Sequence, residues 1–573
     1  MRRGYNEMMI YSGVLFLVLS LAIAFFANAH FGSAKREISP WGHWLICAAA
    51  VAAGCAIRFC ALDTLLAGVN AEEALSAVQA KSLWQTGGFL FDGKLTTQFR
   101  QWTGDAGGPF LAFLAAPFVG VMGMTAAAVR IPLTLLSCAA MFAAYGIGKE
   151  VLGEKAGRWM LVVYALCPAF VLDARFAAAA NAAVFLMPIA FYLLIRGFRT
   201  VYCLYAGMLT LGLLAYTYDV YFFVVPFVMV AAIAAAKASG VKVRHCAASG
   251  VLGFLVYLPA LLTLWVNLSG SDGFVLFGAI EIPRLEVFSK AKFIWTGCQN
   301  IVQIVEAIRS QIYAVVFGCL FQAVRHENIS NALFSPDGIH TFYTMGVPLV
   351  LVGTVVALCA WLDRKKNNKS FSVNQIFLAA TGLTIFAVLL LVGNRGMNDY
   401  AGGTSVYDYS ALFLFVALMM TLGLCRIEEK SVAGRRGMLA LLAASVVMLG
   451  VFLFGGTYQN EANTHFWGLD EACQKAADMQ KETGRKVYIT MSVYPHVDPS
   501  AAAEMMYLYS TDADMVYAAQ KRGEMFEAAY LEGIESLDSD GIYIAAVRDL
   551  YNCDMENWVY EEFGGYALLS QEK

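Results

Sequence analysis

Long apolar runs alternate with short polar segments along most of the chain. A helix needs about 20 apolar residues, within a range of roughly 17–25, to cross the hydrocarbon core of a bilayer. We expect about twelve runs to form such helices. They lie at residues 8–29, 43–62, 128–148, 158–174, 178–196, 201–217, 219–236, 246–267, 341–362, 375–394, 408–425 and 438–457. The pattern therefore predicts a polytopic α-helical membrane protein.

The composition supports this interpretation. Of the 573 residues, 59% are hydrophobic and 14% are charged, against roughly 45–50% and about 25% in an ordinary soluble domain. One water-soluble core could not hide so much apolar surface, which excludes a soluble enzyme and a disordered scaffold. The run at 8–29 is too long for the apolar part of a signal peptide, so we interpret it as a membrane helix.

Basic residues gather on one side of the predicted spans, and the positive-inside rule makes that side cytoplasmic. They are Lys149, Lys155 and Arg158; Arg196 and Arg199; Lys237, Lys242 and Arg244; Arg364, Lys365, Lys366 and Lys369; and Arg426, Lys430, Arg435 and Arg436. This pattern requires that the apolar stretch 108–124 does not cross, so we expect a surface or re-entrant helix there. Residues 63–107, 268–340 and 458–573 then face outward.

The last part of the chain differs from the rest in its charge. From Tyr458 onward, Asp and Glu outnumber Lys and Arg by 21 to 8, although the whole chain has a net charge of only −3. We therefore divide the chain into a transmembrane domain, 1–457, and an extracytoplasmic α/β domain, 458–573. The elements expected in the second domain are helices at 469–483, 501–509 and 515–522 and strands at 486–491, 542–547 and 566–569.

Ionisable side chains are not needed to fill a bilayer, so those that gather at its outer mouth are informative. Glu72 and Glu73 open a helical pattern that runs to Trp84 and includes Lys81. The helix dipole favours ionised carboxylates at a helix start, and an ionised carboxylate can act as a general base. A solvated first helical turn is the alternative for this pair.

Two further polar clusters share the outer face. One consists of Gln98, Arg100, Gln101, Trp102 and Asp105, and the other of Asp173 and Arg175. A guanidinium can bind two phosphate oxygens at once, which suits Arg100 and Arg175 to an anionic head group. The alternatives are a membrane-interface anchor for Trp102 and snorkelling or pairing with Asp173 for Arg175. The cysteines show no CxxC or Cys/His spacing, so we expect no zinc site.

Several stretches resemble one known superfamily. The acidic pair of the first outward loop is followed by "AAAVRIPLTLLSC", by "ALCPAFVLDARF" and by "LGLLAYTY". In this order they are similar to the GT-C superfamily of membrane glycosyltransferases, in the branch of the protein O-mannosyltransferases and the lipid A aminoarabinose transferase. The likeness runs to about residue 270 and recurs at "SPDGIHTFYTMGVPLVLVG", at Asn394 and Arg395, and at "GLDEACQKAADMQ".

The resemblance implies transfer of a sugar from a polyprenyl phosphate to a lipid, protein or glycan acceptor at the outer face of the cell membrane. Glu72 would take the acceptor proton, and Glu73 would orient the site or hold an optional divalent cation. Arg175, with Lys81, Arg100 and Arg395, would neutralise the departing phosphate. We expect the segment 268–340 to cover the cavity, the tail to help recognise the acceptor, and no nucleic acid partner.

Two departures from the superfamily pattern keep other functions open. Glu72 replaces the usual Asp, and the acidic residue often found shortly after the outward Arg is replaced within the run Ala177 to Ala180. A non-catalytic relative that binds lipid-linked sugar in envelope assembly is therefore one alternative. A lipid or sugar transporter is another, but its polar residues would be expected near the middle of the membrane rather than at the outer mouth.

Overall fold

The structure is a computed structural model. It describes residues 39–65, 71–89, 94–100, 106–123, 125–218, 220–285, 298–321, 323–324, 339–340, 342–343, 345–392, 410–430, 432–454, 468–485, 487–489, 541–550 and 558–571.

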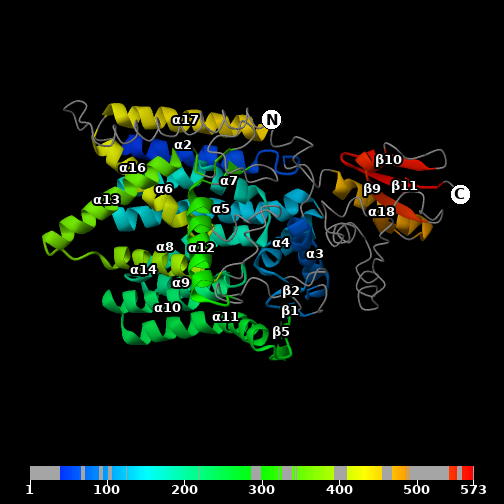
Figure 1. Cartoon of the computed structure of the whole chain (residues 1–573), viewed down its shortest axis with the longest axis horizontal. Helices are drawn as coiled ribbons and strands as arrows, with labels where there is room; N and C mark the ends of the chain where they lie inside the picture. Colours follow the sequence, from blue (N-terminus) through cyan, green and yellow to red (C-terminus); the bar gives the residue numbers. More distant parts are fainter. Residues whose placement is uncertain are drawn as a thin grey trace.

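A bundle of long, roughly aligned helices forms the body of the molecule (Figure 1). Within the described residues, eight helices are long and apolar enough to cross a membrane, or up to nine if the bent pair α6 (Glu154–Leu166) and α7 (Pro168–Arg175) is one span. The eight are α2 (Pro40–Phe59), α5 (Ala126–Leu152), α8 (Ala179–Gly197), α10 (Val220–Ala238), α11 (Val243–Ser269), α13 (Gly346–Lys366), α14 (Val373–Leu391) and α17 (Val432–Phe454). The chain is thus a multi-pass α-helical membrane protein, which confirms the predicted fold class.

The remaining predicted spans differ from these in length or charge. The run at 201–217 forms α9 (Val201–Leu214), which has only 14 residues. The run at 408–425 corresponds to α16 (Phe413–Lys430), an 18-residue helix that ends in charged side chains. The run at 8–29 lies outside the described residues. The total of about twelve spans therefore stays a prediction.

The predicted span at 158–174 is divided between α6 and α7, which meet at an angle of 47°. Pro168 is the physical reason, because it has no N–H to donate to the carbonyl of Tyr164. The fully buried Arg58 supplies the missing donors, at 2.6 Å to the carbonyls of both Tyr164 and Ala165. The hydroxyl of Tyr343 donates to the next carbonyl, that of Leu166, at 2.6 Å.

Short helices and strands cover one end of the bundle, here called the α3 end. They are α3 (Ala71–Thr86), α4 (Phe110–Met122) and strands β1 (Leu95–Thr96), β2 (Phe99–Arg100), β3 (Ala106–Gly107), β4 (Phe274–Leu276) and β5 (Ile280–Ile282). Strand β1 pairs in parallel with β5, which joins the first predicted outward segment to the second. The opposite end, called the α6 end, contains the turn at Gly153 between α5 and α6.

Helix α4 lies in the stretch expected to stay at the surface. Its 13 residues span about 20 Å, short of the roughly 30 Å of a hydrocarbon core. The N–H of Phe110 donates to the carbonyl of Tyr216 at 3.1 Å, which holds the start of α4 on the end of α9. A helix of this length does not cross by itself, in agreement with the expectation for residues 108–124.

The second segment predicted to face outward contains a long helix, α12 (Ile301–Phe321), which runs across the direction of the bundle helices in Figure 1. Strands β6 (Ala323–Val324) and β7 (Ile339–His340) pair after it. On α12, the amide of Gln311 donates to the carbonyl of Leu389 at 2.9 Å, which ties the helix to α14. The expectation that this segment covers a cavity stays a prediction.

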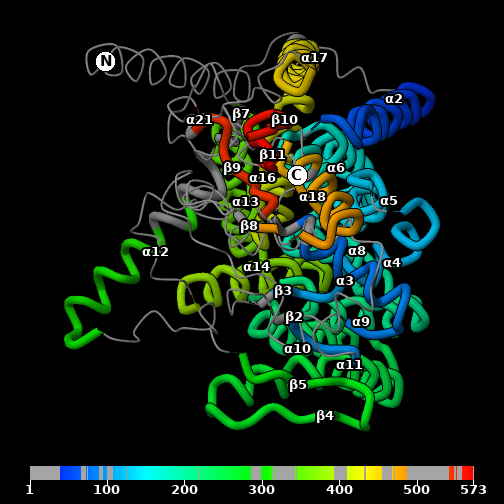
Figure 2. Tube along the Cα trace, turned by 90° about the vertical axis from the view of Figure 1, so that its right-hand side faces the viewer, coloured from blue at the N-terminus to red at the C-terminus, as the bar shows by residue number. Residues whose placement is uncertain are grey.

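The tail forms a small α/β unit beyond α3 and α4 (Figures 1 and 2). Its sheet has the order β10 (Val559–Phe563), β11 (Tyr566–Ser570), β9 (Ile542–Ala546), β8 (Val487–Ile489), with only the β8–β9 pair parallel. Helix α18 (Leu469–Thr483) packs on one face through a cluster that also includes Ala126 of α5. The sequence prediction omitted β10, whose mostly exposed residues give no buried strand pattern. The helices expected at 501–509 and 515–522 lie outside the described residues.

Candidate functional site

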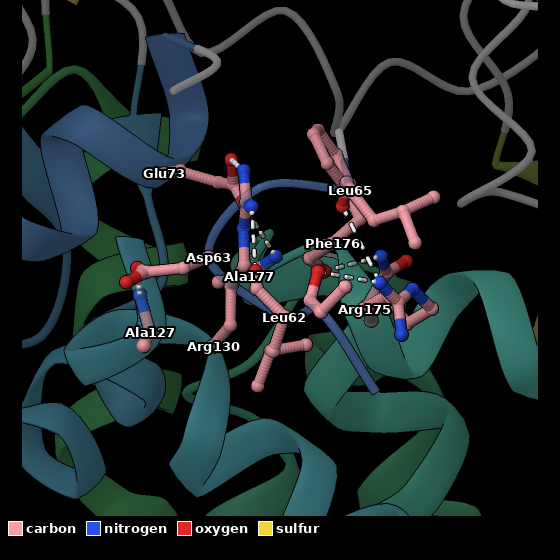
Figure 3. A network of polar contacts seen from close by, with 11 residues as sticks. Leu62, Asp63, Leu65, Glu73, Ala127, Arg130, Arg175, Phe176 and Ala177 are labelled. Atoms are coloured by element: carbon pink, nitrogen blue, oxygen red, sulfur yellow. Dashed lines mark hydrogen bonds and ion pairs between the residues drawn. The ribbon is translucent and has the colours of Figure 1, made fainter. Parts of the chain in front are cut away.

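Glu73 forms a buried ion pair with Arg130 at the α3 end (Figure 3). The Arg130 guanidinium donates from Nε to Oε1 at 2.9 Å and from Nη2 to Oε2 at 2.8 Å. The two side chains are 2% and 0% exposed. Two parallel charge-assisted hydrogen bonds of this kind fix both distance and orientation, so the pair locks the start of α3 against the start of α5.

Neighbouring backbone groups form hydrogen bonds with this pair and beside it. The N–H of Ala177, between α7 and α8, donates to Glu73 Oε1 at 2.8 Å. Arg130 Nη1 donates to the carbonyl of Leu62, just after α2, at 2.9 Å. Asp63 Oδ1 accepts from the N–H of Ala127 at 2.9 Å, in the first turn of α5. Segments around residues 62, 73, 130 and 177 therefore meet at one buried pair.

This convergence tests the predicted topology. The prediction required that the loops containing Glu72 and Arg175 lie at the same end of the bundle. The hydrogen bond from Ala177 to Glu73 brings these loops into direct contact. The two loops therefore share one end, as predicted.

Arg175 is fully buried and holds the end of α2. Its Nη1 donates to the carbonyls of Ile57, Arg58 and Cys60 at 2.7 to 3.0 Å, and its Nη2 to those of Ala61 and Leu65 at 3.1 and 3.4 Å. The last carbonyls of a helix have no partner within the helix, and Arg175 satisfies two of them, those of Ile57 and Arg58, together with three carbonyls that follow the helix. Its predicted contact with a phosphate stays a prediction.

The other predicted site residues are described unevenly. Glu72 is the second residue of α3, and Arg100 ends β2. The side chains of both lie outside the described residues, as do Gln101, Trp102, Asp105 and Arg395 altogether. Lys81 lies further along α3 and is half-buried. Burial lowers the pKa of Lys81 to about 8, because desolvation disfavours its charged form.

Gln98 is buried completely between β1 and β2. Neither atom of its side-chain amide has a hydrogen-bond partner within the part of the chain that the structure describes. The same holds for Oδ2 of Asp173 in α7. Buried polar groups in proteins are nearly always hydrogen-bonded, so these two groups at the α3 end are suited to bind a polar ligand or ordered water.

A divalent cation does not fit the described residues. Among them, no group of three or more His, Cys, Asp or Glu side chains is placed to hold a metal ion. Both carboxylate oxygens of Glu73 accept hydrogen bonds from Arg130, and Oε1 also accepts from Ala177. We therefore derive no catalytic step through a metal at Glu73.

Arg130 and Arg58 are not among the predicted site residues, although both organise this end of the molecule. A signal was present, because each arginine interrupts an apolar run predicted to lie in the membrane. A charged residue within a membrane helix is costly unless it is paired. The sequence thus indicates that such an arginine has partners, but not which ones.

Comparison with known proteins identifies the fold. No protein-family profile and no curated protein sequence matches the chain. Solved structures do match. ArnT from Cupriavidus metallidurans has a TM-score of 0.53 in the apo state, with 10% identity over 93% of this chain and 98% of that chain. Bound to undecaprenyl phosphate, ArnT gives 0.52, with 10% identity over 92% and 97%.

A second neighbour is the archaeal oligosaccharyltransferase AglB from Archaeoglobus fulgidus, in complex with an inhibitory peptide and a dolichol-phosphate. It gives a TM-score of 0.45, with 10% identity over 93% of this chain and 74% of that chain. The match to ArnT extends over nearly the whole length of both chains. The chain therefore has the same fold as ArnT.

Proposed function

We propose that this protein transfers a sugar from a polyprenyl-phosphate donor to an acceptor at the outer face of the cytoplasmic membrane. The shared fold supports a lipid-phosphate donor, because ArnT was solved with undecaprenyl phosphate bound. The α3 end, with α3, α4 and the tail, would face outward. The acceptor would be a lipid, a protein or a glycan.

The main observation behind the proposal is that hydrogen bonds to Glu73 fix the start of α3. Glu73 is fixed by Arg130 and Ala177, so the backbone position of Glu72, its neighbour in α3, is fixed with it. Because Glu73 is committed to Arg130, Glu72 is the carboxylate of the pair that we assign as general base. A carboxylate in the first turn of a helix is kept ionised by the helix dipole, as a base requires.

The proposed reaction is a single displacement with inversion. Glu72 removes the proton of an acceptor hydroxyl, and the acceptor oxygen forms a bond to the anomeric carbon of the sugar. The bond from that carbon to the phosphate oxygen breaks at the same time, and the electron pair leaves with the polyprenyl phosphate. Lys81, Arg100 and Arg395 neutralise the charge that develops on this phosphate.

Glu73 and Arg175 have a positioning role in this proposal. Glu73 sets the start of α3 through Arg130, and Arg175 binds five carbonyls at the end of α2 and in the segment that follows it. The buried amide of Gln98 is suited to a hydroxyl of the sugar or the acceptor, because it can donate and accept hydrogen bonds.

The test is Glu72→Gln in the full-length protein, purified in detergent and incubated with a panel of polyprenyl-phosphate sugars. Released polyprenyl phosphate is the measurement. An amide is nearly isosteric with the acid but cannot take the proton, so release should fall by about 10²–10⁴-fold. Glu471→Gln, on the exposed face of α18, is the matched control and should keep parental activity. If the Glu72 variant turns over like the parent, Glu72 is not the base.

A second candidate function is non-catalytic binding of lipid-linked sugar. The run after Arg175 favours it, because Ala177, Ala178 and Ala180 are buried and supply no carboxylate. In that case the protein would retain a polyprenyl-phosphate sugar through purification and release no polyprenyl phosphate from any donor in the panel. Released product with any donor would exclude this alternative.

A further inference from the structure

A crevice opens at the α6 end of the bundle, between the α5–α6 turn, the middle of α13 and the last turns of α16. Its volume is about 440 Å³. Arg130 and Leu152 lie near the two ends of α5, about 33 Å apart at a helical rise of about 1.5 Å per residue. Since Leu152 lines the crevice, the crevice is far from the Glu73–Arg130 pair and forms no part of the proposed transferase site.

Charged side chains form one part of the lining. Lys155 and Arg426 both contribute to it, and neither has an ion-pair partner among the described residues. Glu154 also lines the crevice, but its carboxylate is held by Lys149 at 2.6 Å and by the hydroxyl of Tyr145 at 2.8 Å. Glu429 is the other acidic lining residue. Glu429 has no ion-pair partner in the part of the chain that the structure describes, so Lys155 and Arg426 together leave a net positive charge in the crevice.

Apolar side chains form the other part. Val356 of α13 and Leu422 of α16 line the crevice. The neighbouring Val355 and Leu358 of α13 are 59% and 54% exposed, as expected for side chains that face lipid in a membrane helix. The crevice thus has a cationic rim and an apolar wall at the membrane boundary. These two parts are complementary to the phosphate and the acyl chains of a phospholipid.

We propose that this crevice binds an anionic phospholipid of the cytoplasmic leaflet, with the phosphodiester between Lys155 and Arg426 and an acyl chain along Val356 and Leu422. A guanidinium and an ammonium both bind phosphate oxygens well. The lipid would hold α13 and α16 against the α5–α6 turn. Because it binds the folded state, it would raise the unfolding temperature as its concentration rises.

The experiment uses the full-length protein in detergent, titrated with phosphatidylglycerol or with phosphatidylethanolamine of the same acyl chains. Native mass spectrometry measures the bound fraction, and thermal unfolding measures stabilisation. Phosphatidylglycerol should bind more tightly, because phosphatidylethanolamine carries no net charge. Lys155→Gln and Arg426→Gln should each weaken phosphatidylglycerol binding about fivefold, from the attraction of one basic residue near a lipid surface.

Two control experiments distinguish lipid binding in the crevice from general attraction to the surface charge of the protein. Lys237→Gln with Arg244→Gln removes two exposed cations from α10 and α11 at the same end and should leave binding unchanged. Leu422→Trp fills the apolar part without changing charge and should weaken binding. Equal binding of the two lipids, equal losses in the control pair, or displacement by soluble glycerol phosphate would each overturn the proposal.

Discussion

The two ends of the bundle each contain a buried arginine–glutamate pair, and the pairs differ in what they connect. At the α3 end, Arg130 and Glu73 also bind the backbone of Leu62 and Ala177. At the α6 end, Arg158 donates to both carboxylate oxygens of Glu428 at 2.6 and 2.7 Å. Within the described residues, the other polar contacts of that second pair are to the side chains of Trp159 and His43.

The difference follows from the local backbone. Around Arg158 the partners are side chains of α2, α6 and α16. Around Arg130 the partners lie where α2 ends, α3 begins and α7 passes into α8, where backbone groups lack helical partners. A buried arginine at the α3 end therefore stabilises irregular backbone, whereas the pair at the α6 end joins side chains of three helices.

The largest expected effect comes from removing the acid of each pair. Glu73→Ala and Glu428→Ala each leave a buried arginine without its carboxylate, which should lower the free energy of unfolding by about 3 to 5 kcal/mol. Thermal unfolding in detergent measures this. Only the Glu73 variant should also lose transfer activity per folded molecule, because only that pair positions α3. Equal activity losses in the two variants would show that the ends do not differ in this way.

Arg175 tests the backbone contacts of the α3 end with a smaller effect. Arg175→Ala leaves five carbonyls without their donor and should cost about 3 kcal/mol in unfolding free energy. Arg175→Lys keeps the charge and up to three donors, so its loss should be smaller. If Arg175 is a positioning residue, stability and donor affinity fall together across the two variants. A loss of donor affinity with unchanged unfolding temperature would instead favour direct contact with the phosphate.

Lys81 gives the smallest effect, a pH dependence. Burial lowers the pKa of Lys81 to about 8, so the side chain is charged below that pH and neutral above it. If it attracts the donor phosphate, donor affinity should fall as pH rises from 7 to 9, by about fivefold for the loss of one charge. The measurement is donor affinity across this pH range. Lys81→Arg, which stays charged, should remove the dependence, and a parental slope in that variant would assign it to another group.

The sequence predicted the elements of the membrane domain well. Of the spans it indicated, those from residue 43 onward each coincide with a helix or, at 158–174, with the bent pair. The reason is that apolar length and helical period are local properties that a short window contains. The tail helix and three of its strands were found by the same local patterns, but β10 was missed because its side chains are exposed.

Only the tertiary structure decided which groups meet. The sequence singled out Glu73 and Arg175, but it did not show that Glu73 pairs with Arg130, which lies 57 positions later. Nor did it show that Arg58 satisfies carbonyls of a helix more than 100 positions away. An unpaired charge or carbonyl in a membrane interior is costly, so the sequence indicates that each such group has a partner. Many arrangements could supply these partners, and only the packing of all the helices against one another selects one.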